Sequence, residues 1–175
     1  ESDMILVALG ANLPGSWGSP KEGLEAALAQ FPTYGLKVET VSPFYLTPAV
    51  TPYAQPDFVN GVASISSALD PSDLLKQLHR IEAAFGRVRG QRWAERTLDL
   101  DLIDYNGLVL PESGGKGPVL PHPRVAERAF VLGPLVDIAP NWRHPILGTS
   151  AKELFEAVSI EDRQGMKQLT SASKG

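Results

Sequence analysis

Apolar and acidic residues alternate with a period of two from Leu98 to Leu102. Because successive side chains of a β-strand point to opposite faces, this pattern places Asp99 and Asp101 on one face and the leucines on the other. An ionised carboxylate is costly to bury without a compensating charge. The segment therefore predicts a strand from Thr97 to Tyr105 that buries its leucine face and needs a cation beside its acidic face.

The acidic pair has the spacing of a divalent-cation site. Side chains on one face of a strand lie ~6 to 7 Å apart, so Asp99 and Asp101 can bind one cation, or two cations ~3.5 to 4 Å apart. Four of the nine arginines fall within the ten positions that precede the strand, at Arg87, Arg89, Arg92 and Arg96. A guanidinium group can bind phosphate oxygens through two hydrogen bonds. Metal and arginine together indicate transfer of a phosphoryl or pyrophosphoryl group.

Composition narrows the class of protein. The chain has 175 residues, 43% of them hydrophobic, which fits a single domain spanning residues 1–175. A net charge of -4 argues against a nucleic-acid partner, and the lack of cysteine excludes thiolate chemistry. No apolar run is long enough to span a membrane, so we expect a cytoplasmic protein. Residues 1–3 are expected to be an expression remnant, and residues 160–175 a loose polar tail.

The order of predicted elements indicates an α+β fold. Strands are predicted at 4–9, 36–46 and 58–65, the second interrupted at Ser42-Pro43, and helices at 20–31 and from Pro71 to Phe85. With the strand at 97–105, the order is strand, helix, strand, strand, helix, strand. This is the split β-α-β pattern of a ferredoxin-like antiparallel sheet flanked by helices.

Further elements are predicted after this unit. Asn106-Gly107 is typical of a hairpin turn, with residues 108–110 as the returning strand. Helical segments are predicted within 124–138 and at 149–158.

Several sequence motifs resemble those of the 6-hydroxymethyl-7,8-dihydropterin pyrophosphokinase family, in the family's order. The resemblance implies transfer of pyrophosphate from ATP, as co-substrate, to a pterin alcohol in folate biosynthesis, with Mg²⁺, expected as two ions. It implies small-molecule partners and no obligate protein partner. The motifs are Leu9-Gly10-Ala11-Asn12-Leu13, Phe44-Tyr45-Leu46-Thr47-Pro48, Gln55-Pro56-Asp57-Phe58-Val59-Asn60, Arg96-Thr97-Leu98-Asp99-Leu100-Asp101-Leu102, Leu120-Pro121-His122-Pro123 and Glu127-Arg128-Ala129-Phe130-Val131-Leu132.

The resemblance also implies roles for individual residues. Arg87 and Arg96 would assist the transfer, and Asp99 and Asp101 would be the metal ligands. We expect His122 to donate a hydrogen bond to phosphate and not to act as a base. The residues expected to bind ATP are Glu82, Arg89, Arg92, Trp93, Arg96, Leu102, His122 and Arg128.

A pterin is a flat ring system that needs stacking surfaces and hydrogen-bonding groups at its edge. By resemblance, Phe58 and Phe130 supply the two stacking faces and Trp93 closes the pocket. The amide of Asn60 can both donate and accept at the pterin edge. The residues expected to bind the pterin are Thr47, Pro48, Val50, Phe58, Asn60, Trp93 and Phe130.

Two other classes of protein use similar features. A nucleotidyltransferase also binds Mg²⁺ through paired aspartates, but it releases pyrophosphate, whereas a pyrophosphokinase releases AMP. A ferredoxin-like RNA-binding module could use the arginine segment as its contact. Against that alternative, acidic residues occupy a sheet position where such modules place stacking aromatic residues.

Overall fold

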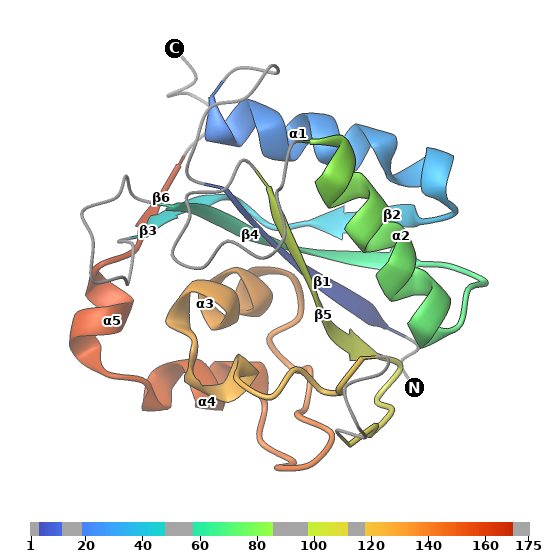
Figure 1. Cartoon of the computed structure of the whole chain (residues 1–175). Helices are drawn as coiled ribbons and strands as arrows, with labels where there is room; N and C mark the ends of the chain where they lie inside the picture. The colour runs from blue at the N-terminus through green and yellow to red at the C-terminus, as the bar shows by residue number, and fades with distance from the viewer. Residues whose placement is uncertain (1–3, 12–18, 48–57, 86–97, 112–117, 170–175) are drawn as a thin grey trace.

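The computed structural model describes residues 4–11, 19–47, 58–85, 98–111 and 118–169. An antiparallel sheet lies between two layers of helices, with α1 and α2 over one face and α3 and α4 over the other (Figure 1). The strands are β1 (Ile5–Ala11), β2 (Lys37–Val41), β3 (Tyr45–Thr47), β4 (Phe58–Ser66), β5 (Asp99–Tyr105) and β6 (Lys167–Gln168). The helices are α1 (Pro20–Gln30), α2 (Pro71–Ala84), α3 (Ala129–Ile138), α4 (Ala151–Ala157) and α5 (Ile160–Gln164), with 3-10 turns η1 (Phe31–Tyr34) and η2 (Val125–Glu127).

The strand order confirms the predicted ferredoxin-like arrangement. The strands run β5-β1-β4-β3-β6, and β2 also pairs with β4. All of these pairs are antiparallel, and β1 is hydrogen-bonded to β4 on one side and to β5 on the other. The acidic strand β5 therefore lies at one edge of the sheet, beside the central strand β1.

Local sequence signals set the element boundaries. Ser19 caps α1 through a capping box with Glu22, and Asp70 caps α2 by accepting from the N–H of Asp73. The predicted break at Ser42-Pro43 separates β2 from β3, and the Ser42 hydroxyl accepts from the N–H of Val62 at 3.0 Å. The predicted helix starts and the strand interruption are confirmed.

The alternating side chains of β1 separate two hydrophobic cores. Ile5, Val7 and Leu9 pack in a core with buried residues of α1 and α2. Leu6 and Ala8 point to the opposite face and pack in a core with residues of α3 and α4. Because β1 is buried on both faces, it holds β5 and β4 in fixed register on either side.

The predicted returning strand at residues 108–110 does not form. The turn itself is present, with positive φ at both Asn106 and Gly107. Leu108 and Leu110 then leave the sheet, and Leu110 makes an isolated bridge with Leu120. The N–H of His122 donates to the carbonyl of Ile103 at 2.9 Å, so the later segment takes the outer edge of β5 instead.

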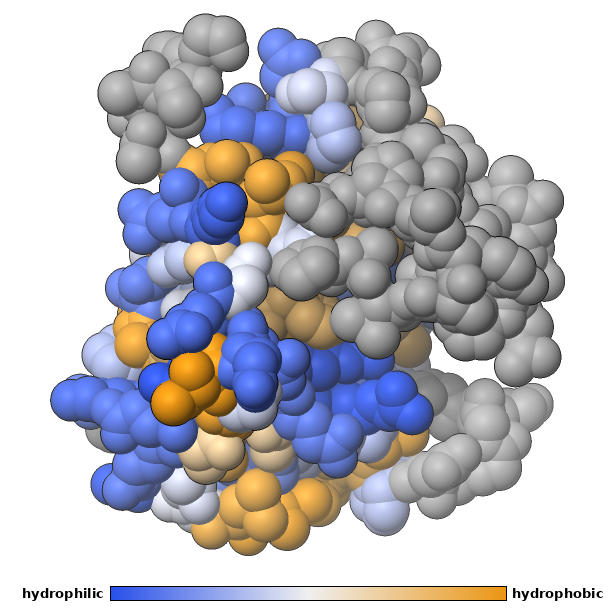
Figure 2. All heavy atoms as spheres, turned by 90° about the vertical axis from the view of Figure 1, so that its left-hand side faces the viewer, coloured by the Kyte–Doolittle hydropathy of each residue, from blue (hydrophilic) through white to orange (hydrophobic). Residues whose placement is uncertain are grey.

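The predicted loose tail is also wrong for residues 160–168, which form α5 and β6. The N–H of Leu169 donates to the carbonyl of Phe44 at 2.8 Å, and Met166 packs against Gly133 of α3. These contacts hold the segment beside β3, on a face where the described residues are mostly hydrophilic with separate apolar patches (Figure 2). Within the described ranges, no helix is long and apolar enough to cross a membrane.

Candidate active site

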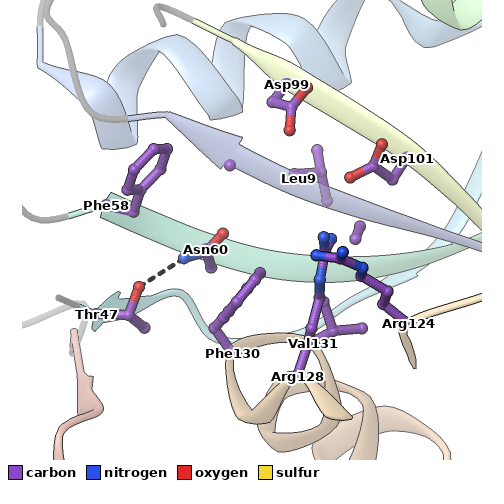
Figure 3. Close-up of a pocket in the computed structure, with 12 residues that line it drawn as sticks. Leu9, Thr47, Phe58, Asn60, Asp99, Asp101, Arg124, Arg128, Phe130 and Val131 are labelled. Carbon is purple, nitrogen blue, oxygen red and sulfur yellow. Dashed lines mark hydrogen bonds between the residues drawn. The ribbon is translucent and has the colours of Figure 1, made fainter. Parts of the chain in front are cut away.

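A cavity of about 400 Å³ lies where the central strands meet the N-terminal end of α3 (Figure 3). Strands β1, β3, β4 and β5 form one side, and the segment through η2 into α3 forms the other. The lining residues are Ala8, Leu9, Gly10, Thr47, Phe58, Asn60, Asp99, Asp101, Arg124, Arg128, Phe130 and Val131.

Asp99 and Asp101 project from β5 into this cavity, and both residues are half-buried. The intervening Leu100 is 2% exposed in the core beneath α2, as the alternating pattern predicts. Carboxylate oxygens are the ligands that Mg²⁺ prefers, so the pair fits a hard divalent cation. Among the described residues, no group of three or more acidic or histidine side chains could hold a metal ion.

The Glu82 side chain is buried beneath the acidic strand. The residue is 1% exposed in α2, and its Oε2 accepts a hydrogen bond from the N–H of Leu100 at 2.7 Å. It does not line the cavity. Leu102, also expected at the nucleotide, is 4% exposed and packs in the core on the α2 side.

Two arginines face the acidic pair across the cavity. The side chains of Arg124 and Arg128 both line the cavity and point toward the side that carries Asp101 (Figure 3). The Arg128 guanidinium carbon lies 5.5 Å from the ring centroid of Phe130, a distance at which the cation and the ring attract each other. Opposite charges on facing walls can bind a metal-polyphosphate complex, with the cation on one side and phosphate oxygens on the other.

His122 lies next to this charged region in a defined protonation state. Its Nδ1 accepts from the N–H of Arg124 at 3.1 Å. The pKa of His122 is lowered to about 4, mainly by burial and then by the positive charges of Arg128 and Arg124, against an opposing effect of Asp99. A neutral imidazole that accepts at Nδ1 carries its proton on Nε2. The ring therefore offers an N–H donor at neutral pH.

The other half of the cavity combines an amide with two aromatic rings. Asn60 is 8% exposed, and its Nδ2 donates to the hydroxyl oxygen of Thr47 at 2.7 Å. Phe58 and Phe130 reach the cavity from β4 and α3 (Figure 3). A Cβ at Gly10 would lie 2.7 Å from Oδ1 of Asn60, so only glycine fits there without moving the amide.

Seven of the predicted site residues meet around this one cavity, although they come from four separate parts of the chain. They are Thr47, Phe58, Asn60, Asp99, Asp101, Arg128 and Phe130. Leu102 belongs to β5, and Glu82 and His122 are hydrogen-bonded to that strand, but none of the three lines the cavity. Pro48, Val50, Arg87, Arg89, Arg92, Trp93 and Arg96 lie outside the described residues.

Arg124 and Gly10 line the cavity but were not predicted as site residues from the sequence. Arg124 stands two positions after His122 and four before Arg128. Because both of these residues were predicted to bind ATP, the position of Arg124 between them could have indicated that it belongs to the site. In the sequence, Gly10 stands at the end of an apolar run and was named only as part of the motif Leu9-Gly10-Ala11-Asn12-Leu13. Its role depends on a strand partner 50 residues away, since Gly10 pairs with Asn60.

The chain is similar to known proteins of one family. The family model described as 7,8-dihydro-6-hydroxymethylpterin-pyrophosphokinase matches residues 6–140. A Pseudomonas aeruginosa protein named 2-amino-4-hydroxy-6-hydroxymethyldihydropteridine pyrophosphokinase is 41% identical over 169 residues, covering 96% of this chain and 98% of the relative. A Synechocystis protein of the same name is 39% identical over 154 residues, covering 87% of this chain and 75% of the relative.

A solved structure supports the fold. Plasmodium falciparum HPPK-DHPS, crystallised with pteroate, superposes with a TM-score of 0.67 at 13% identity and covers 89% of this chain. The chain spans less than half of that longer protein, 44% of its length. At this low identity the likeness shows the fold alone.

Proposed function

The chain belongs to the 7,8-dihydro-6-hydroxymethylpterin-pyrophosphokinase family, and from that membership we propose how its cavity carries out the reaction. The enzyme is an ATP-dependent diphosphotransferase of folate biosynthesis. It transfers pyrophosphate from ATP to the hydroxymethyl group of 6-hydroxymethyl-7,8-dihydropterin and releases AMP. One observation carries the assignment of the site: a carboxylate pair and an arginine pair face each other beside an aromatic and amide compartment.

Asp99 and Asp101 would hold Mg²⁺, expected as two ions, between the strand and the phosphates of ATP. When bound, the metal neutralises charge that develops on the transferring phosphates. The half-buried position of both residues supports this role, because the carboxylates are accessible from the cavity while their strand is anchored in the core.

The basic side of the cavity would bind the phosphates themselves. Arg124 and Arg128 supply guanidinium groups at the cavity, and His122 adds the N–H of Nε2. His122 cannot accept a proton at Nε2 while that atom already carries one, so it acts as a donor and not as a general base. Arg87 and Arg96 remain the expected further contributors to the transfer. The reaction then depends on positioning and charge neutralisation.

The pterin would lie between Phe58 and Phe130, with its edge at Asn60. The hydrogen bond from Asn60 to Thr47 uses one of the two N–H donors of the amide and fixes the orientation of the side chain. Oδ1 is then directed toward Gly10 and can accept from an N–H group of the pterin ring. The bound hydroxymethyl oxygen would attack the β-phosphorus of ATP, the bond between the α-phosphate and the β-phosphorus would break, and AMP would leave.

Product analysis tests this function. Incubation of the protein with ATP, Mg²⁺ and the pterin alcohol should yield AMP and the pterin diphosphate in equal amounts. Release of pyrophosphate would instead assign a nucleotidyltransferase. Salt-sensitive RNA binding without ATP turnover would assign an RNA-binding module. The expected cytoplasmic location, single-domain organisation and lack of an obligate protein partner stay predictions.

A further inference from the structure

The buried carboxylate of Glu82 stands out on a helix face that is otherwise apolar. Leu74, Leu78 and Ile81 of α2 are completely buried in the core over the sheet, and Glu82 is 1% exposed on the same helix. Burying an ionised carboxylate is unfavourable unless strong hydrogen bonds compensate. A leucine or methionine would fill such a position at lower cost, so a carboxylate here indicates a specific task.

The hydrogen-bond partner of Glu82 indicates what the task is. Its Oε2 accepts from the N–H of Leu100 at 2.7 Å, and Leu100 is the residue between Asp99 and Asp101. A hydrogen bond from a backbone N–H to a carboxylate is shorter and stronger than a neutral one. Because Leu100 is joined by peptide bonds to both aspartates, fixing its N–H fixes the direction of both acidic side chains.

The location at the sheet edge makes this support necessary. β5 is the terminal strand, and β1 is its one strand neighbour in the described sheet. Without a second strand, the outward N–H and carbonyl groups of β5 have no ladder to hold them. Glu82 binds the outward N–H of Leu100, and the N–H of His122 binds the carbonyl of Ile103 at 2.9 Å. These two hydrogen bonds bracket Asp101.

We propose that Glu82 is a positioning residue that holds the metal-binding strand through its hydrogen bond to Leu100, in place of the nucleotide contact expected from sequence. This inference rests on the proposed function, because it assumes that Asp99 and Asp101 bind the cation. Groups that orient metal ligands without touching the metal typically change metal affinity by ~10 to 100-fold when they are removed. Glu82 would be such a group, acting through the backbone.

Two substitutions separate the hydrogen bond from the charge. Glu82→Gln keeps an oxygen acceptor at the same reach and removes the charge. Glu82→Asp keeps the charge and withdraws the acceptor by one methylene group. We expect Glu82→Asp to weaken Mn²⁺ binding in the presence of a nonhydrolysable ATP analogue by ~10-fold or more, and Glu82→Gln to weaken it less. Pterin affinity should stay unchanged in both variants.

Amide hydrogen exchange of Leu100, measured on the metal-free and nucleotide-free protein, provides a readout independent of activity. Exchange at Leu100 should accelerate in Glu82→Asp and stay slow in Glu82→Gln. Asp104→Asn is the matched control, because Asp104 is 2% exposed on the same strand and does not line the cavity. It should leave both Mn²⁺ affinity and Leu100 exchange unchanged.

Unaltered Mn²⁺ affinity in Glu82→Asp would overturn the proposal, as would a larger loss in Glu82→Gln than in Glu82→Asp. A higher KM for ATP with normal Leu100 exchange in both variants would restore the nucleotide-contact role instead. Asp101→Ala distinguishes failure of the inference from failure of the function. If Asp101→Ala still binds Mn²⁺, the metal site itself is wrong; if it loses Mn²⁺ while Glu82→Asp does not, only the role of Glu82 is wrong.

Discussion

The two ends of β5 carry the same kinds of side chain in different surroundings. At one end Asp99 and Asp101 are half-buried at a cavity, whereas at the other end Asp104 is 2% exposed. Oδ2 of Asp104 accepts from the indole N–H of Trp142 at 2.9 Å, and no hydrogen-bond partner of its Oδ1 is found in the described part of the chain. Burial raises the pKa of Asp104.

All three aspartates share one face of the sheet. Asp101 pairs with Ala8 and Asp104 with Leu6, and both partners belong to the core on the α3 side. The two ends therefore differ in what lies over the aspartate side chains, and not in the face of the sheet from which these side chains project. An aspartate under Trp142 is closed off from solvent, and an aspartate beside the cavity can meet a ligand. The aspartates at the two ends of β5 therefore differ in solvent exposure, not in residue type or in the face of the sheet they occupy.

The largest contrast between the two ends is expected for their carboxylates. Asp101→Ala should lower the rate of AMP formation by ~10³-fold or more, because a bound metal contributes several kcal/mol to transition-state stabilisation. Pterin binding, followed by fluorescence, should persist. Asp104→Asn should keep the rate of AMP formation per folded molecule. Equal loss of activity in both variants would remove the distinction between the ends.

The next contrast concerns the arginines. Arg124 faces the acidic pair, while Arg143 lines a separate cavity beside Asp104 and donates to the carbonyl of Gly148 at 2.8 Å. Arg124→Ala should lower kcat/KM for ATP by ~10²-fold, since it removes a charged donor aimed at the phosphates. Arg143→Ala should leave kcat/KM unchanged. Steady-state kinetics with varied ATP tests this, and a wild-type value for Arg124→Ala would contradict its phosphate role.

A smaller contrast is expected for two glycines. In Gly10→Ala the new methyl group would displace Oδ1 of Asn60, at an overpacking cost of ~1 to 3 kcal/mol. Because the displaced amide no longer meets the pterin edge, the KM for the pterin should rise about tenfold. Gly107→Ala meets no atom within 4 Å but is strained by its φ of 76°. It should reduce stability without changing the KM. A wild-type KM for the pterin in Gly10→Ala would show that Asn60 does not hydrogen-bond to the pterin edge.

The smallest contrast concerns the histidines, His122 at the cavity and His144 near Asp104. Burial is the main factor that lowers the pKa of each. The unfolded chain therefore binds a proton at each histidine near pH 6.5, whereas the folded state does so only at lower pH. The free energy of unfolding keeps its full value above about pH 6.5 and decreases as the pH falls below it. For His122 this decrease continues to about pH 4.

His122→Gln and His144→Gln should each flatten this loss of stability in urea unfolding between pH 6.5 and about 4. Only His122→Gln should also weaken ATP binding. A steeper pH dependence in either variant would show that the sign of the linkage is wrong.

Much of the fold could be predicted from local signals. The capping residues Ser19 and Asp70 and the prolines that follow them define the starts of α1 and α2. The failures came from segments whose partners are distant. Residues 108–110 have strand-like composition, but the edge of β5 was taken by His122. Residues 160–168 read as a polar tail, yet they are held by β3 and α3.

In the candidate site, too, residues in local motifs were predicted, whereas features that depend on distant contacts were not. Seven expected residues meet at one cavity because they are tied to short motifs with a chemical signature. The nucleotide role of Glu82 was expected from the family resemblance, and its burial beneath β5 could not be seen from a polar residue on a helix. Arg124 was missed because only its position, two residues after His122 and four before Arg128, distinguishes it from a surface arginine.

By itself, the sequence determined which chemical groups this protein carries and the alternation that puts Asp99 and Asp101 together. A strict period of two would also have placed Asp104 on the opposite face. The register shift of β5 against β1 leaves Ile103 without a partner and returns Asp104 to the face of the acidic pair. Only the tertiary structure decided that, because register depends on pairing with β1, and exposure depends on Trp142, 38 residues farther along the chain.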